Sequence, residues 1–463
     1  MIETIRNAWK VPELKKKILF TIMALLIFRL GSAIPVPYID ADSLRSYLEM
    51  QSGTILGLMN AMSGSAFSMA TIFALSIQPY INSSIIIQLL TVAIPALERL
   101  AKEGGEEGRK KIASITRYTT VAIALLQGFG YYSLVNSWGL VNGGTLNSIW
   151  VAVVIILSFT AGSAFLMWLG EQITEFGIGN GISILLFAGI VSRFPQMVTD
   201  IISGVSMWNN VRSGALTADA LVESGLYSTA EDAQRYIDTL SLPPWMVAVI
   251  AVGMLALVVF IVFISNAERR LPVQYAKRVV GRKMYGGQST HIPIKVNMSG
   301  VMPIIFAQSI AMLPATIGAF MGWTTATEGG GGTLMRLFDT SRPFYSILYF
   351  LLIVGFSYFY ASMTFNPIEV ANNLKKNGGF IPGFRPGKPT ADFITRVLNK
   401  ITMFGALYLS VVAIAPIITG NIVGYSSLAI GGTSVIIVVG VALETVKQME
   451  AQMLMRHYKG FLE

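Results

Sequence analysis

The sequence contains no cysteine and few charged residues. Without cysteine, thiol catalysis and a disulfide framework are both excluded. Charged residues make up 13% of the 463 residues, against about 25% in soluble domains. Hydrophobic residues reach 53%, and apolar runs exceed the roughly 20 residues that cross a bilayer. These features exclude a soluble enzyme and a disordered chain, and they predict an integral membrane protein.

Residues typical of catalysis are also scarce. The two histidines, His291 and His457, lie in basic segments outside the apolar runs, and no HExxH, GxSxG or P-loop motif occurs. We therefore expect no catalytic residue, no cofactor and no metal site. The N-terminus lacks the short apolar core and cleavage site of a secretory signal, so we expect the first span to remain as an anchor.

The uncharged runs predict about ten transmembrane helices. An ionised group at the bilayer centre costs at least about 2.5 kcal/mol, so runs such as 118–170 and 401–443 must lie in the membrane. Ten is even, so both termini lie on one side. Of the 34 Lys and Arg residues, 27 fall in five segments, which the positive-inside rule assigns to the cytoplasm: 1–20, 98–117, 268–298, 365–400 and 444–463.

The predicted fold class is an all-α membrane protein with ten transmembrane helices in two inverted pseudo-symmetric halves, a re-entrant plug helix and two cytoplasmic hairpin loops. Each half has five spans, an odd number, which gives the halves the opposite orientation of an inverted repeat. The expected segments, in chain order, are a cytoplasmic N-terminal segment (1–20), a first half with spans one to five (21–201), an extracytoplasmic connection (202–243), a second half with spans six to ten (244–446) and a cytoplasmic C-terminal tail (447–463). The second half contains the two cytoplasmic loops, 268–298 and 365–396.

The uncharged run 50–97 is too long for one crossing and too short for three. Its front part, about 53–70, is rich in glycine and serine. We favour a re-entrant plug here over a small-residue helix packed in the bundle, because irregular backbone survives at membrane depth only inside protein or against a cavity. The expected plug residues are Leu58, Met59, Asn60, Met62, Ser63, Gly64 and Phe67.

One charge, Arg29, interrupts the first span, 18–37. Two interpretations remain open at this stage. The side chain either extends outward to the membrane surface, or it faces an aqueous cavity inside the bundle.

Two cytoplasmic loops predict a docking surface. Residues 268–298 contain two β-like runs around Gly286-Gly287 and predict a protruding hairpin. Residues 371–390 predict a second hairpin, with Phe384 and Arg385 at its tip. Positive-inside charge alone also explains the lysines, but not the turn residues. Ribosomal RNA or an acidic protein groove would suit the basic residues Lys277, Arg278, Arg282, Lys283 and Arg385.

Five long strings are spread over most of the chain: FRLGSAIPVPYID (28–40), PYINSSIIIQLLTV (79–92), GEQITEFGIGNGISILLFAGI (170–190), QYAKR with QSTHIPIKVNMSGVMPIIFA (274–307), and FNPIEVANNLKKNGGFIPGFRPGKPT (365–390). They resemble the bacterial SecY family, the central subunit of the Sec protein-conducting channel. The resemblance implies a channel that translocates unfolded secretory polypeptides and releases transmembrane segments laterally into the plasma membrane, with both termini cytoplasmic.

The resemblance also implies site residues. An apolar ring would line the constriction of the pore: Ile77, Ile81, Ile182, Leu186, Ile305 and Ile437. A lateral gate between the second and seventh spans, with the third and eighth behind them, would use polar side chains: Asn82, Ser83, Gln88, Gln127, Gln308 and Ser309.

The family's partners would be the small membrane subunits SecE and SecG, the motor ATPase SecA, the ribosome, unfolded preproteins and anionic lipids. The chain itself would not be an enzyme, since a docked motor or ribosome would supply the driving force. A secondary transporter with inverted repeats is the alternative, but it would normally need an intramembrane acidic or cation-binding cluster. An intramembrane hydrolase lacks its catalytic residues.

Overall fold

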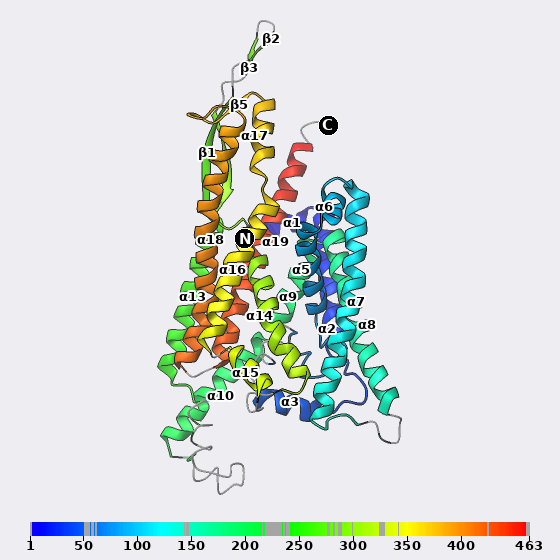
Figure 1. The fold of residues 1–463 in the computed structure, drawn as a ribbon. Coiled ribbons are helices and arrows are strands. Elements are labelled where there is room, and N and C mark those ends of the chain that lie inside the picture. Colours follow the sequence, from blue (N-terminus) through cyan, green and yellow to red (C-terminus); the bar gives the residue numbers. More distant parts are fainter. Residues whose placement is uncertain are drawn as a thin grey trace.

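The structure is a computed structural model. It describes residues 2–50, 56, 60, 63–142, 144, 148–214, 216, 217, 234, 237, 241–275, 278–280, 283–285, 289–298, 300–323, 329–340, 342–423 and 426–459. The described chain is a helical bundle with a small sheet projecting from one end (Figure 1).

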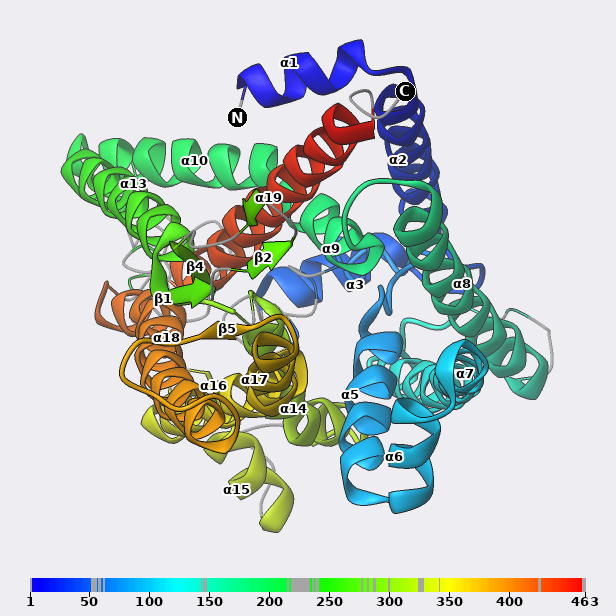
Figure 2. The same cartoon turned by 90° about the horizontal axis from the view of Figure 1, so that it is seen from above.

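The helices form two groups that follow the order of the chain (Figure 2). The first group contains α1 (Ile2–Lys10), α2 (Pro12–Gly31), α3 (Ala41–Met50), α5 (Gln78–Ala93), α6 (Pro95–Lys102), α7 (Gly105–Ser137), α8 (Ser148–Phe176), α9 (Gly181–Val191) and α10 (Phe194–Arg212). The second contains α13 (Pro244–Asn266), α14 (Met302–Phe320), α15 (Gly330–Leu337), α16 (Pro343–Thr364), α17 (Pro367–Lys376), α18 (Lys388–Val423) and α19 (Ser426–Lys459). The groups meet where α1 and α9 contact α19, and where α14 contacts α5 and α7.

Ten helical units of this bundle match the ten predicted spans. Among the described residues, six helices are long and apolar enough to cross a membrane, and the bent pair α5–α6, with an angle of 105°, adds a seventh. The helices α2, α7 and α19, of 20, 33 and 34 residues, lie in the same bundle and complete the ten. The bend follows Ala93, where Pro95 begins α6 and prevents a continuous helix.

The ends of the bundle agree with the distribution of charge along the chain. In Figure 1, α1, α6, α17, the sheet and the end of α19 lie toward one end, whereas α3 and α15 lie at the other. The first set comes from the five Lys- and Arg-rich segments. The helix α1 and the end of α19 thus lie toward the same end of the bundle, and the side of the membrane that they face stays a prediction.

The two predicted loops contribute strands to a shared three-stranded sheet, and the first loop also forms a two-stranded sheet. Strand β1 (Glu268–Tyr275) pairs antiparallel with β4 (Ser289–Lys295), and β5 (Gly379–Phe380) pairs with the other edge of β1. The two β-like runs of the predicted hairpin pair with each other as β1 and β4, and Gly286-Gly287 lie outside the described residues. Strands β2 (Arg278–Val280) and β3 (Lys283–Tyr285) also pair antiparallel.

The second predicted loop reverses mainly between two helices. Residues 367–376 form a helix, α17, whose first turn is capped by the Asn366 side chain, and only the two residues of β5 are extended. The loop completes the sheet of the first loop because a free strand edge accepts a further strand. The Gly- and Pro-containing turns indicated a reversal, but not its pairing partner.

Several helices continue past the predicted segment boundaries. The helix α10 runs beyond 201 to Arg212, α18 begins at Lys388 inside the predicted loop 365–396, and α19 continues beyond 446. Charge marks where a helix leaves the membrane, but nothing in a Lys or Glu side chain ends a helix.

Glycines allow close approach of backbone within the first group. A Cβ on Gly162 of α8 would overlap the carbonyl oxygen of Ile72, and one on Gly181 of α9 would overlap that of Gly170. The chain before α5 therefore packs against α8 at van der Waals distance.

Replacing Gly162 with alanine should destabilise this packing by about 1–3 kcal/mol, because the Cβ overlaps backbone that cannot move freely. Thermal unfolding of the detergent-solubilised chain measures the effect. Gly355→Ala in α16 is the matched control, since its Cβ meets open space and alanine favours a helix. Equal melting temperatures of the two variants would contradict the packing argument.

Candidate functional site

Residues 63–77 leave the helical pattern in the interior of the bundle. They form a series of turns, and most of their side chains are buried. At the base of this stretch, Val36 N–H donates to Ala70 O (2.9 Å) and Ile72 N–H donates to Ile34 O (3.0 Å). We call residues 60 and 63–70 the plug segment. Of the expected plug residues, Asn60, Ser63, Gly64 and Phe67 are described, whereas Leu58, Met59 and Met62 lie outside the described residues.

Side chains of the plug segment satisfy its own backbone. Ser63 Oγ accepts the Phe67 N–H (3.0 Å), and Asn60 Oδ1 accepts the Ser68 N–H (3.0 Å). Short polar side chains can replace helical hydrogen bonds in this way. The serine content that predicted an irregular segment is therefore what allows the turns to lie buried in the bundle.

The plug segment contacts both α7 and α9. Gly64 has φ +66°, and a Cβ there would lie 2.7 Å from Ser192 Oγ and 2.8 Å from Gly189 O, at the end of α9. On the other side, the Phe67 ring meets Tyr131 of α7 edge to face, with the ring centroids 4.8 Å apart. The segment is thus enclosed by helices rather than exposed on the surface of the bundle.

The six predicted ring residues all lie in or against one apolar cluster. Ile77, Ile81, Leu186, Ile305 and Ile437 are at most 3% exposed, and Ile182 is half-buried. They come from the start of α5, from α9, α14 and α19, which are the helices that line the contact between the two groups. Near Gly170 of α8, atoms of Ile77 and Ile182 lie 3.5 Å from the same Cβ position. Their role as a pore ring stays a prediction.

The gate residues divide into two sets. Four of the six gate residues have a buried polar atom that lacks a hydrogen-bond partner within the described part of the chain: Asn82 Oδ1, Gln127 Oε1, Gln308 Oε1 and Ser309 Oγ. They lie on α5, α7 and α14, which contact one another. By contrast, Ser83 Oγ donates to Thr116 O of α7 (2.8 Å), and Gln88 donates to Ser84 Oγ within α5. Ser83 therefore fastens α5 to α7 and bonds nothing on α14.

Sequence reasoning missed an ion pair that joins α7 to α8. Arg117 Nε and Nη2 each lie 2.9 Å from a carboxylate oxygen of Glu171, in a two-pronged contact. The hydrogen bond to Glu171 raises the pKa of Arg117. Sequence pattern assigned Arg117 to a basic segment and Glu171 to the end of a span, so no local signal identified the pair.

A second missed group lies where the sheet meets α19. Burial raises the pKa of Glu444, and the charge of Lys295, at the end of β4, opposes this shift. Lys447 Nζ donates to Ser265 O at the end of α13 (3.1 Å), and burial lowers its pKa. These charged groups connect three elements at the base of the projecting sheet.

The docking residues are described in part. Arg385 is exposed, and its carbonyl oxygen accepts a hydrogen bond from Thr390 Oγ1 (2.8 Å). The neighbouring Phe384 stacks on Phe393 of α18, with the ring centroids 4.1 Å apart. Arg278 and Lys283 lie on the strands β2 and β3 at the projecting tip, and Lys277 and Arg282 lie outside the described residues.

Beneath these loops, a second apolar cluster joins the sheet to α17 and α18. Its buried members are Leu271, Val273, Ile294, Leu374, Ile381, Ile394 and Leu398. The loops are therefore an ordered platform where the structure describes them, rather than a flexible basic tail.

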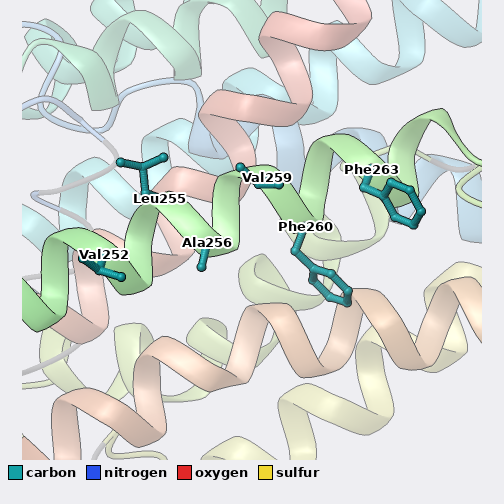
Figure 3. A pocket seen from close by; sticks show the side chains of 6 residues that line it. All are labelled: Val252, Leu255, Ala256, Val259, Phe260 and Phe263. Carbon is teal, nitrogen blue, oxygen red and sulfur yellow. The ribbon is translucent and has the colours of Figure 1, made fainter.

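The outer surface of the bundle is apolar. An open groove on α13 is lined by Val252, Leu255, Ala256, Val259, Phe260 and Phe263, all aliphatic or aromatic (Figure 3). None of these was predicted as a site residue, and the groove suits contact with lipid or with another apolar helix. Arg29 is exposed in the last turn of α2, where the helix dipole favours a cation. This position favours the outward orientation of Arg29 over an inward one.

Comparison with known proteins decides the family. The SecY family model matches residues 71–446. The chain belongs to the SecY family. It is 44% identical over 475 residues to the protein translocase subunit SecY of Streptomyces coelicolor, and 42% identical over 470 residues to that of Bacillus licheniformis, with 100% of both chains covered in each case. The SecY family consists of multi-pass membrane subunits of a protein translocase rather than enzymes.

Solved structures show the same fold at low sequence identity. A protein-conducting channel aligns with a TM-score of 0.62 at 18% identity, covering 97% of both chains. A SecY channel whose plug domain stabilises the closed state aligns with a TM-score of 0.60 at 18% identity, with the same coverage. Sec61 of the canine ribosome-channel complex aligns with a TM-score of 0.59 at 17% identity, again covering 97% of both chains. The ten-helix SecY fold predicted from the sequence is confirmed.

Gly64→Ala should displace the plug segment from α9. The overlap with Gly189 and Ser192 costs about 1–3 kcal/mol, which favours the displaced state by roughly tenfold and raises ion leakage in planar bilayers. Gly139→Ala is the control, because Gly139 also has a positive φ (+70°) but its Cβ would meet nothing within 4 Å. If both variants leaked equally, backbone strain rather than the contact would be responsible.

Proposed function

We propose that this SecY-family chain forms a channel for unfolded secretory polypeptides across the bacterial plasma membrane, and that it releases transmembrane segments sideways into the lipid. The observation that carries the proposal is the plug segment. A buried, non-helical stretch enclosed by helices has little structural purpose in a solid bundle, but it suits a removable stopper. A secondary transporter is not favoured, because the full-length relatives are named protein translocase subunits.

The apolar ring would form the seal of this channel. Branched aliphatic side chains offer an ion no ligand, and a narrow apolar constriction expels water when it is empty. Ile81 of α5 and Ile437 of α19 come from opposite groups of helices. Separation of the groups would widen the ring around a passing polypeptide.

The contact between α5, α7 and α14 would be the lateral gate. Four unpaired polar atoms make this contact weak, since each buried unpaired group destabilises it. Polar contacts between membrane helices average only about 0.6 kcal/mol. A signal helix of about 20 residues gains about 0.3–0.6 kcal/mol per apolar residue in lipid. The entering helix would therefore gain more free energy from the lipid than the gate loses in polar contacts.

The platform of cytoplasmic loops would receive the source of driving force. Sec61, which shares this fold, was solved in a ribosome-channel complex. For this chain we propose docking of the ribosome or of the motor ATPase SecA on Arg385 and the β2–β3 tip. The small subunits SecE and SecG would pack on the apolar outer helices, and anionic lipids would meet the basic ends of the spans. Both termini would lie in the cytoplasm.

Replacing Ile81 and Ile437 together with asparagine should give a standing ion conductance, because polar side chains keep the constriction wet. The double variant should also admit precursors with defective signals. Planar-bilayer recording and translocation into vesicles measure the two effects. The control is Ile86→Asn, which changes an exposed position of the same helix. A double variant that shows no ion conductance and normal signal selectivity would refute the ring. A secondary transporter would show no such leak.

Charge reversal at Arg385 should reduce translocation by at least about tenfold, because a like charge at a docking surface repels the partner. Membrane insertion of the chain itself should remain normal. Translocation of a precursor into vesicles measures the loss. Arg396→Glu provides the control, as Arg396 is also exposed but lies farther along α18. Full activity of Arg385→Glu would remove Arg385 from the docking surface.

A further inference from the structure

Tyr131 of α7 joins the plug segment to the body of the bundle. Its hydroxyl donates a hydrogen bond to Phe67 O at 2.7 Å. Its ring packs edge to face on Phe67, and on its other side against Phe159 of α8, with the centroids 4.6 Å apart. All three side chains are 0% exposed. A column of three rings therefore runs from the plug segment through α7 to α8.

The bonds around the plug segment differ in what they connect. Most lie inside it, such as those from Ser63 and Asn60, and they can move with it as a unit. Apart from the hydrogen bonds of the adjoining Thr71 to Ala66 O, two hydrogen bonds between described residues join the plug segment to the surrounding structure. One is Val36 N–H to Ala70 O at its base, next to the covalent connection. The other is Tyr131 to Phe67, away from that base. Movement of the segment about its base breaks the second bond first.

The Tyr131 bond has a strength suited to a reversible contact. A buried phenol requires a partner, and in the closed arrangement Phe67 O supplies it. The same oxygen also accepts the Ala70 N–H (3.2 Å), so it keeps one partner when Tyr131 is lost. Water entering the space that the plug segment vacates can hydrate the free hydroxyl. Opening of the plug segment therefore breaks one hydrogen bond between neutral groups and the ring contacts of Tyr131. It does not break an ion pair between buried charges.

We propose that Tyr131 is a positioning residue that acts as the latch of the plug segment, holding it closed through the hydroxyl bond to Phe67 O. This inference rests on the proposed channel function in one respect, which is that release of the latch opens the channel. Tyr131 acts on the closed state alone, because the bond exists only while the plug segment lies against α7.

The test uses the absence of cysteine from the chain. Ser68→Cys places a buried thiol in the plug segment, and its reaction with a water-soluble maleimide in nanodiscs reports local opening. Tyr131→Phe keeps the ring and removes the hydroxyl, so it should accelerate labelling of Cys at position 68 by about two- to tenfold, the range for loss of one hydrogen bond. Ion leakage of the same variant should rise in parallel.

Two matched controls separate a latch from general loosening. Tyr349→Phe removes a hydroxyl that is equally buried and has no partner in the described chain, and it should leave labelling at position 68 unchanged. Ser357→Cys reports on α16, where Ser357 is 2% exposed, and Tyr131→Phe should not change its labelling. Equal labelling at position 68 in the two phenylalanine variants, or faster labelling at position 357, would overturn the latch.

The labelling result stands apart from the channel proposal. Thiol labelling measures movement of the plug segment whether or not the chain conducts polypeptides. Faster labelling without any leak would support the latch and contradict the channel. Unchanged labelling, together with a leak in the Ile81 and Ile437 double variant, would support the channel and contradict the latch.

Discussion

Inside a bilayer every backbone N–H and C=O group needs a partner within the protein, and this constraint shapes the molecule. Most of the described chain meets it by forming helices. Residues 63–77 meet it with side chains such as Ser63, and with backbone pairing to Ile34 and Val36. Such a segment can exist at membrane depth only if helices enclose it. The plug segment and the two helical groups around it are therefore one structural solution.

The first helical group is held together more firmly than the two groups are held to each other. Within the first group, the Arg117–Glu171 ion pair joins α7 to α8, and Ser83 joins α5 to α7. Between the groups, at α5, α7 and α14, buried amide and hydroxyl oxygens lack partners. Rigid groups that meet at a weakly bonded surface can separate and close again without unfolding, as a channel with a lateral exit requires.

The projecting sheet has its own apolar cluster and is not merely a pair of basic loops. The helix α18 begins shortly after Arg385 and runs without a break from Lys388 to Val423, in contact with α16 and α19. The charged groups at Glu444 and Lys447 lie near the base of the same sheet. A force applied to this platform would reach the bundle through rigid elements.

Sequence alone determined the membrane class and the ten spans, because charge and hydropathy act along the chain one segment at a time. It also located β1 and β4, whose alternating residues pair within one loop. Only the tertiary structure decided the addition of β5, the Arg117–Glu171 pair and the bond from Tyr131 to Phe67. These contacts join residues that are distant in sequence, 64 positions apart in the last case, and packing between helices, rather than any local pattern, selects such partners.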